Sequence, residues 1–189
     1  MNTPAHLIFG LAAFGKPDAP KIALAALAGS IIPDLSLYLM VGWHLAILGT
    51  DPQIVFRELY YSDAWMQVFA IDNSFILWGL AFGLALYTRR SWAIALTGAA
   101  LLHLALDFPL HHDDGRPQFW PLTMWIYESP VSYWDNRNGG WWIGPLEALL
   151  STALVAWIII RFRALWIRAT ALVLLVMEWS ASGIWRFIF

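Results

Sequence analysis

The sequence predicts an all-α fold, a polytopic helical transmembrane bundle with about five spanning helices and a short N-terminal re-entrant or half helix. Hydrophobic residues make up 60% of the 189 residues and charged residues only 13%, which is outside the range of soluble domains. Apolar runs of about 20 residues, the length that crosses a bilayer, recur between Gly, Pro and charged stretches. We therefore expect one integral-membrane helical domain over residues 1–189, surrounded by the lipid bilayer.

The expected helices follow from these apolar runs. The first, at about residues 4–15, is too short to span the hydrocarbon core. Longer helices are expected at about residues 21–48, 64–88, 91–110, 141–160 and 165–187. The start, "MNTPAHLIFGLAAFGK", lacks the features of a cleaved signal peptide, so we expect it to be retained.

The charged residues indicate an orientation and exclude some functions. Most basic residues lie in three connections that the positive-inside rule places in the cytoplasm: Lys16, Lys21, Arg89, Arg90, Arg161, Arg163 and Arg168. The opposite side then holds the 111–140 loop, which is rich in Trp and Tyr and serves as an aromatic anchor, a lid or a structured cap. Without a clustered basic face, no nucleic-acid partner is expected. The absence of cysteine excludes disulfides and thiolate metal sites.

Ionisable residues inside the expected helices fall at one depth. Counting the helical rise from the basic connections places them roughly 15 to 25 Å away, toward the outer half of the core. They are His6, Asp34, Asp72, His103, Asp107 and Glu147. Such groups are costly in a membrane and usually face a cavity. Several carboxylates in a low dielectric need a cation among them, which predicts a divalent metal site.

The stretch "LLHLALDFPLHHDD" supplies two of the expected ligands. His103 and Asp107 are four residues apart, so they project from one helix face. His111 continues the row, but Pro109 should bend or end the helix before it. Imidazole and carboxylate ligands together favour zinc, with manganese or iron as alternatives.

Two further stretches carry polar residues at the same depth. In "GSIIPDLSLYLM", Pro33 kinks the helix and Asp34 follows it as a predicted metal ligand. In "FAIDNSFILWG", Asp72 is predicted to face the site, and Asn73 or Ser74 to bind substrate or orient a ligand; interhelical hydrogen bonding is the alternative. Either Asp72 or Glu147 is the candidate general base.

These motifs resemble those of the bacterial membrane-bound metal-dependent hydrolases, a family that includes a LexA-regulated inner-membrane protein. The resemblance lies in "TPAHLIFG" with His6, in "PDLS" as the Pro-Asp-x-Asp element, and in the His-x-x-x-Asp of His103 and Asp107. The chain is divergent, because Ser36 replaces the second Asp of the Pro-Asp element. The family's His-Arg-Gly-x-Thr-His-Ser element is represented only by "FAIDNS", in which Asn73 stands at the His that precedes Ser74.

The resemblance and the depth count together predict a hydrolase that acts on an amphiphilic ester or phosphoester by metal-activated water. The metal ligands would be His6, Asp34, Asp72, His103, Asp107 and, after the proline, His111. The resemblance implies the bacterial inner membrane, with the site toward the outer face. Two alternatives stay open, a small membrane carrier or ion- or substrate-binding protein, and a non-catalytic membrane protein.

Overall fold

The computed structural model describes the backbone of residues 1–188 and the side chains of residues 1–181. Over these residues the chain is helical and contains no strand, which confirms the all-α prediction. The helices are α1 (Thr3–Phe14), α2 (Pro20–Gly42), α3 (Pro52–Ile54), α4 (Asp63–Asp72), α5 (Phe75–Tyr87), α6 (Ser91–Asp107), α7 (Gly140–Arg161) and α8 (Leu165–Ile188).

Four stretches among the described residues are long and apolar enough to cross a membrane, so the chain is a multi-pass membrane protein. They are Pro20–Ile47, Asp63–Tyr87, Ser91–Leu110 and Gly140–Arg161. The number agrees roughly with the expected five. Helix α1 is apolar but shorter, as the half-helix prediction requires.

The expected helix at 64–88 is interrupted after Asp72. Helix α4 ends there, and Ser74 caps α5 by accepting a hydrogen bond from the Leu77 backbone N–H at 3.1 Å. The cause is local, because Asp, Asn and Ser side chains bond nearby backbone groups in competition with the helical pattern. A second difference is the short helix α3, followed by a π-helical turn at Val55–Leu59, in a segment expected to be a plain connection.

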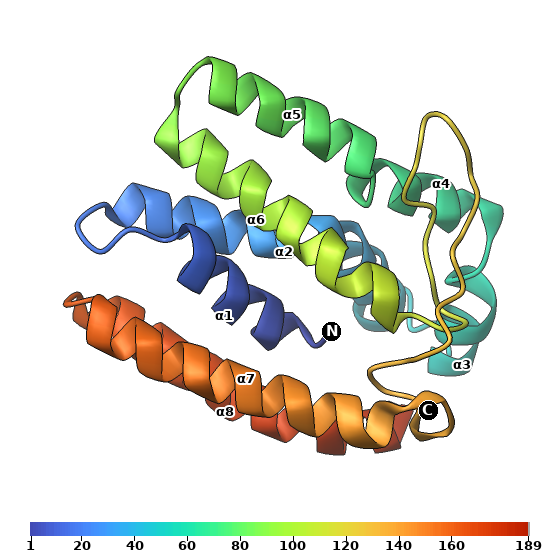
Figure 1. Cartoon of the computed structure of the whole chain (residues 1–189). Helices are drawn as coiled ribbons and strands as arrows, with labels where there is room; N and C mark the ends of the chain where they lie inside the picture. Colours follow the sequence, from blue (N-terminus) through green and yellow to red (C-terminus); the bar gives the residue numbers. More distant parts are fainter. Residues whose placement is uncertain (189) are drawn as a thin grey trace.

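Helix α1 lies between two parts of the bundle, with α2, α5 and α6 on one side and α7 and α8 on the other (Figure 1). It contacts α2, α6, α7 and α8. The three short connections that carry the basic residues lie at one end of the bundle, and the loop after α6 lies at the opposite end (Figure 1). The half helix therefore places its side chains in the interior.

Helices α2 and α6 approach so closely that only glycine fits at one point of contact. A Cβ atom on Gly29 would lie 1.9 Å from the backbone oxygen of Leu96. This close approach brings the following turn of α2, which carries Pro33 and Asp34, next to the ligand-bearing face of α6.

The loop between α6 and α7 is a structured cap over one end of the bundle. The backbone N–H of Ser129 donates to the His111 carbonyl at 2.9 Å, and that of Tyr133 donates to the Leu110 carbonyl at 3.1 Å. The backbone N–H of Phe75, at the start of α5, donates to the Gln118 carbonyl at 2.9 Å. The last two bonds tie the loop to the end of the Ser91–Leu110 stretch and to the start of α5.

Candidate metal centre

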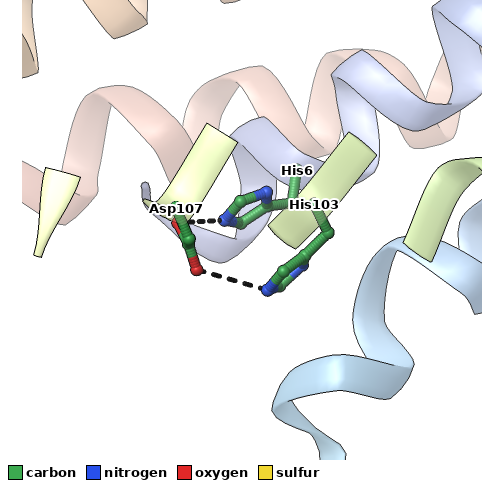
Figure 2. Close-up of side chains that lie close together, drawn as sticks. All are labelled: His6, His103 and Asp107. Carbon is green, nitrogen blue, oxygen red and sulfur yellow. Dashed lines mark hydrogen bonds and ion pairs between the residues drawn. The ribbon is translucent and has the colours of Figure 1, made fainter. Parts of the chain in front are cut away.

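Three of the predicted ligands meet in the bundle interior. His6 comes from α1, while His103 and Asp107 come from α6, and all three are buried. Nε2 of His6 lies 2.9 Å from Oδ1 of Asp107, and Nε2 of His103 lies 3.3 Å from Oδ2 (Figure 2). The imidazole rings stack with centroids 3.7 Å apart. One ligand atom from each residue lies within 4.8 Å of the others, a spacing on which a single ion can be held.

The backbone contact at Nδ1 of His103 fixes the tautomer of its neutral ring. Nδ1 lies 2.7 Å from the backbone carbonyl oxygen of Ser30, which can only accept a hydrogen bond. Nδ1 must therefore carry the proton, which leaves Nε2 with a lone pair in the neutral ring. Among the described residues, this buried Nε2 has no hydrogen-bond partner. An imidazole oriented through one nitrogen with the other free is the usual arrangement of a metal ligand.

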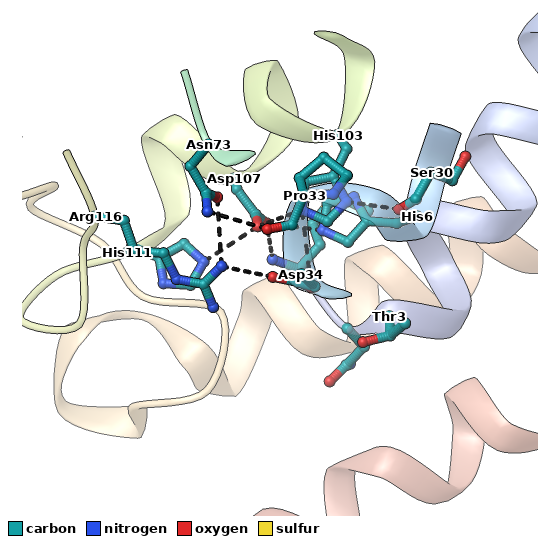
Figure 3. Close-up of polar contacts among 12 residues, drawn as sticks. Thr3, His6, Ser30, Pro33, Asp34, Asn73, His103, Asp107, His111 and Arg116 are labelled. Carbon is teal, nitrogen blue, oxygen red and sulfur yellow. Dashed lines mark hydrogen bonds and ion pairs between the residues drawn. The ribbon is translucent and has the colours of Figure 1, made fainter. Parts of the chain in front are cut away.

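Asp34 adds a second carboxylate to the cluster. Its Oδ2 lies 3.8 Å from Nε2 of His103, and its Oδ1 accepts a hydrogen bond from Arg116 at 2.7 Å (Figure 3). Because Pro33 has no N–H, the helical hydrogen-bond pattern of α2 is broken in the same turn that supplies the Ser30 carbonyl to His103. The proline thus lies in the turn of α2 that contacts His103, at the place in an apolar run where a cavity was expected.

Arg116 belongs to the centre but was not among the predicted site residues. It reaches back from the 111–140 loop, and its guanidinium lies 4.8 Å from the centroid of the Phe69 ring. Nη1 also donates to Oδ1 of Asn73 at 3.3 Å. In the sequence, Arg116 stands out only as a basic residue in an acidic and aromatic loop, directly after the helix that carries His103 and Asp107.

Asn73 orients groups around the centre. Its Nδ2 lies 3.0 Å from the Pro33 carbonyl oxygen, 3.1 Å from that of Phe69 and 2.9 Å from Oδ1 of Asp72. Its Oδ1 accepts from the arginine that holds Asp34. Asn73 therefore joins the α4–α5 break to α2 and to the loop.

The two neighbours of Asn73 in the sequence, Asp72 and Ser74, have other roles. The Asp72 carboxylate, bound by Asn73, lies outside the group of His6, His103 and Asp107. Ser74 caps α5 and donates its hydroxyl to the Trp120 carbonyl at 2.5 Å. The structure thus gives Ser74 a structural role and does not bring Asp72 to the three ligands.

His111 lies at the loop end of the centre. Its Nε2 is 3.5 Å from Oδ2 of Asp107, and its Nδ1 is 3.0 Å from Oδ1 of Asp114. Burial alone would lower the pKa of His111, but the carboxylates of Asp114 and Asp107 raise it to about 9. A protonated imidazole cannot bind a metal, so in this arrangement His111 acts as a cation between two carboxylates.

Glu147 lies beside the N-terminal residues. It is buried on α7 and accepts a hydrogen bond from the backbone N–H of Asn2 at 2.6 Å. The side chain of Asn2 donates to Glu178 at 3.0 Å. Glu178 was not among the predicted site residues, yet it also lies beside the N-terminal residues. The Met1 amino group contacts Oδ1 of Asp107, the oxygen that also faces His6. One oxygen of each carboxylate in this region thus meets a donor or a cation, while Oε2 of Glu147 and Oε2 of Glu178 are buried without a hydrogen-bond partner among the described residues.

A cavity of about 600 Å³ leads away from the centre. Its polar end holds Asp34, Asp107, His111 and Arg116. Its apolar walls come from α1, α2 and α8, including Leu7, Ile31, Leu174, Val176 and Met177. The volume is in the range of small-molecule binding sites.

Neither a model of a known family, nor a curated protein, nor a solved structure matches the chain. The resemblance to membrane-bound metal-dependent hydrolases therefore stays a prediction.

Proposed function

We propose that this protein is a membrane-embedded metal-dependent hydrolase in which His6, His103 and Asp107 hold one divalent cation. The main support is His103. Its Nδ1 donates to the Ser30 carbonyl, and its Nε2 is buried without a hydrogen-bond partner among the described residues, beside the carboxylates of Asp107 and Asp34. A lone pair facing carboxylate oxygens is repulsive unless a proton on Nε2 or a metal cation lies between them, and we propose the metal cation.

The residue types fit a catalytic site. Three ligands of the His-His-carboxylate kind, with a further coordination position left open, are typical of catalytic zinc, which is our preferred metal over manganese or iron. Such an ion would lower the pKa of a bound water and polarise an ester or phosphoester oxygen.

The surrounding residues have separate roles in this proposal. Arg116 holds one oxygen of Asp34, which leaves Oδ2 facing the ligands as the acceptor of a proton from the attacking water. Asp34 replaces Asp72 and Glu147 as our candidate base, because it lines the cavity and both others are held by hydrogen bonds outside the three-ligand group. Asn73 orients Arg116.

We further propose the bacterial inner membrane as the location, with the centre toward the outer face. The basic connections at the end opposite the 111–140 loop support this orientation through the positive-inside rule. An amphiphilic ester or phosphoester is the expected substrate, because the cavity joins the ionisable centre to apolar walls.

The test is the metal content of the purified full-length protein, prepared without chelator and measured by elemental analysis. We expect about one divalent ion per chain, lost in both His103→Ala and Asp107→Asn. Asp34→Asn should keep the ion, which separates the base from the ligands. The matched control is His112→Ala, because His112 bonds the Ser129 carbonyl at 2.6 Å and lies outside the three-ligand group.

Well-folded protein without stoichiometric metal would contradict the proposal. The Met1 amino group and Arg116 would then balance Asp107 and Asp34, as the non-catalytic alternative requires. Uptake into proteoliposomes that depends on Asp34 and Asp107, without any turnover, would instead favour the carrier.

A further inference from the structure

The cavity beside the centre has two chemically different ends. At one end lies the guanidinium of Arg116 together with Asp34 and Asp107. The rest is walled mainly by apolar side chains of α1, α2 and α8. A ligand that fills it must carry a polar group at one end and a hydrocarbon body at the other.

The apolar end opens toward the membrane. Val176 and Met177 of α8 line the cavity, yet they are 68% and 51% exposed on the molecular surface. The apolar run of α8 was expected from the sequence to form a long membrane helix, and the outer surface of a spanning helix faces lipid. A hydrocarbon chain can therefore enter the cavity directly from the bilayer, along the walls that α1, α2 and α8 supply.

The polar end contains one guanidinium that can hold an anion. Arg116 uses Nη1 for Asp34 and Asn73, and its Nε lies 3.4 Å from the Tyr60 hydroxyl. None of the hydrogen bonds found among the described residues uses its Nη2. A guanidinium with free N–H groups at the edge of a cavity matches the oxygens of a phosphate.

We propose that this cavity binds a phosphate-bearing acyl lipid, with the phosphate at Arg116 and the chain against the apolar walls of α1, α2 and α8. The inference rests on the proposed function in one respect, because the lipid is offered as the substrate of the metal centre. It names the substrate class, a lipid phosphoester that enters sideways from the membrane. A second cation at His6, His103 and Asp107 would favour a phosphate further, since phosphate carries more charge than a carboxylate.

The headgroup, and not the acyl chain, should decide which lipid the cavity prefers. An acyl chain that leaves a bilayer for an apolar cavity exchanges one apolar environment for another, so the chain adds little preference. Hydrogen bonds to charged groups typically correspond to roughly a 10- to 100-fold difference in affinity. We therefore expect discrimination between a phosphate lipid and a neutral lipid with the same chain.

The experiment measures binding to the full-length protein in nanodiscs, both zinc-loaded and EDTA-treated. The probe is 1-oleoyl-glycerol 3-phosphate, compared with 1-oleoyl-glycerol, oleate and inorganic phosphate, and the readout is the bound fraction by native mass spectrometry. The phosphate lipid should bind at least about tenfold more tightly than the neutral lipid. Inorganic phosphate alone should bind weakly, because it is not concentrated in the bilayer beside the cavity as the lipid is.

Two variants test the two ends separately. Arg116→Gln should abolish the preference for phosphate, and Arg116→Lys should restore part of it, which guards against a simple folding defect. Ala181→Trp, which fills the α8 wall, should reduce binding of both lipids at least about tenfold. Ala169→Trp is the matched control, because Ala169 is exposed on the same helix outside the cavity and should bind as the unaltered protein does.

Equal binding of the phosphate and neutral lipids would overturn the inference, and so would unaltered binding in Ala181→Trp. Equal binding of oleate would overturn the assignment to phosphate. Lipid binding without stoichiometric metal would leave this inference standing and contradict the hydrolase. Stoichiometric metal without lipid binding would contradict this inference and leave the hydrolase proposal standing.

Discussion

Nδ1 of His103 donates a hydrogen bond of 2.7 Å to the Ser30 carbonyl, so a backbone group of α2 fixes the orientation of an imidazole on α6. The contact holds the ring with Nε2 toward Asp107. Because this ring is held toward Asp107, replacing His103 tests directly whether the centre binds a metal.

The first prediction concerns zinc affinity. Loss of a partner that merely orients a ligand costs roughly 10- to 100-fold in metal affinity, so His103→Ala should weaken zinc binding by more than this. Competition with a fluorescent zinc chelator measures the affinity. His44→Ala is the control, because His44 bonds Thr50 away from the centre at 3.1 Å. Equal zinc affinity in both variants would remove His103 from the ligand set.

The second prediction concerns the close approach of α2 and α6. In Gly29→Ala the new methyl group would meet the Leu96 backbone oxygen, and the two helices would have to separate. We expect a loss of about 1 to 3 kcal/mol in the free energy of unfolding, together with weaker metal binding. Gly83→Ala is the control, because a Cβ there has no neighbour within 4 Å, and alanine should stabilise that helix by about 0.5 to 1 kcal/mol. Chemical denaturation in mild detergent measures both variants; a Gly29→Ala protein as stable as the unaltered chain would contradict the argument.

The third prediction concerns pH. The pKa of His111, raised from 6.5 to about 9, gives a stabilisation that is fully present below about pH 6.5 and lost as the pH rises through about 9. For EDTA-treated protein, this group should lower the free energy of unfolding by roughly 2 to 3 kcal/mol between pH 7 and pH 10. Denaturation at several pH values measures the slope, which His111→Gln should reduce. The same slope in both proteins would show that His111 is not charged at pH 7.

The fourth prediction concerns Asn73. Leucine at this position cannot bond the Pro33 carbonyl or Arg116 and leaves both buried groups without that partner. We expect Asn73→Leu to cost about 1 to 3 kcal/mol in the free energy of unfolding. Asn136→Leu, at an exposed position, should change it by less than about 0.5 kcal/mol. A difference too small to measure between the two variants would exclude the orienting role.

The depth of the ligands could be predicted because the rise of a helix per residue is constant. His6, Asp34, His103 and Asp107 were placed at one level by counting, and the structure brings them together. The four-residue spacing likewise predicted that His103 and Asp107 share a face.

Other parts of the centre could not be predicted from the sequence. Three consecutive polar residues, Asp72, Asn73 and Ser74, interrupt a helix that hydropathy treats as continuous, so the direction of each side chain depends on the break. Arg116 lies in a loop without periodicity, and only the tertiary hydrogen bonds of that loop bring it to Asp34. Asn73 and Arg116 both contact α2, through the Pro33 carbonyl and the Asp34 carboxylate, and the sequence does not contain these tertiary contacts.

The short length of α1 has a consequence for assembly. Its 12 residues extend about 18 Å, less than a hydrocarbon core of about 30 Å, so it cannot insert as a spanning segment by itself. It is made before α6, α7 and α8, yet it contacts all three. His6 can therefore reach His103 and Asp107 only after α6 has been made and has packed against α1. The proposed metal centre thus cannot form while only the first half of the chain has been made, and zinc binding would report that α6 has docked on α1.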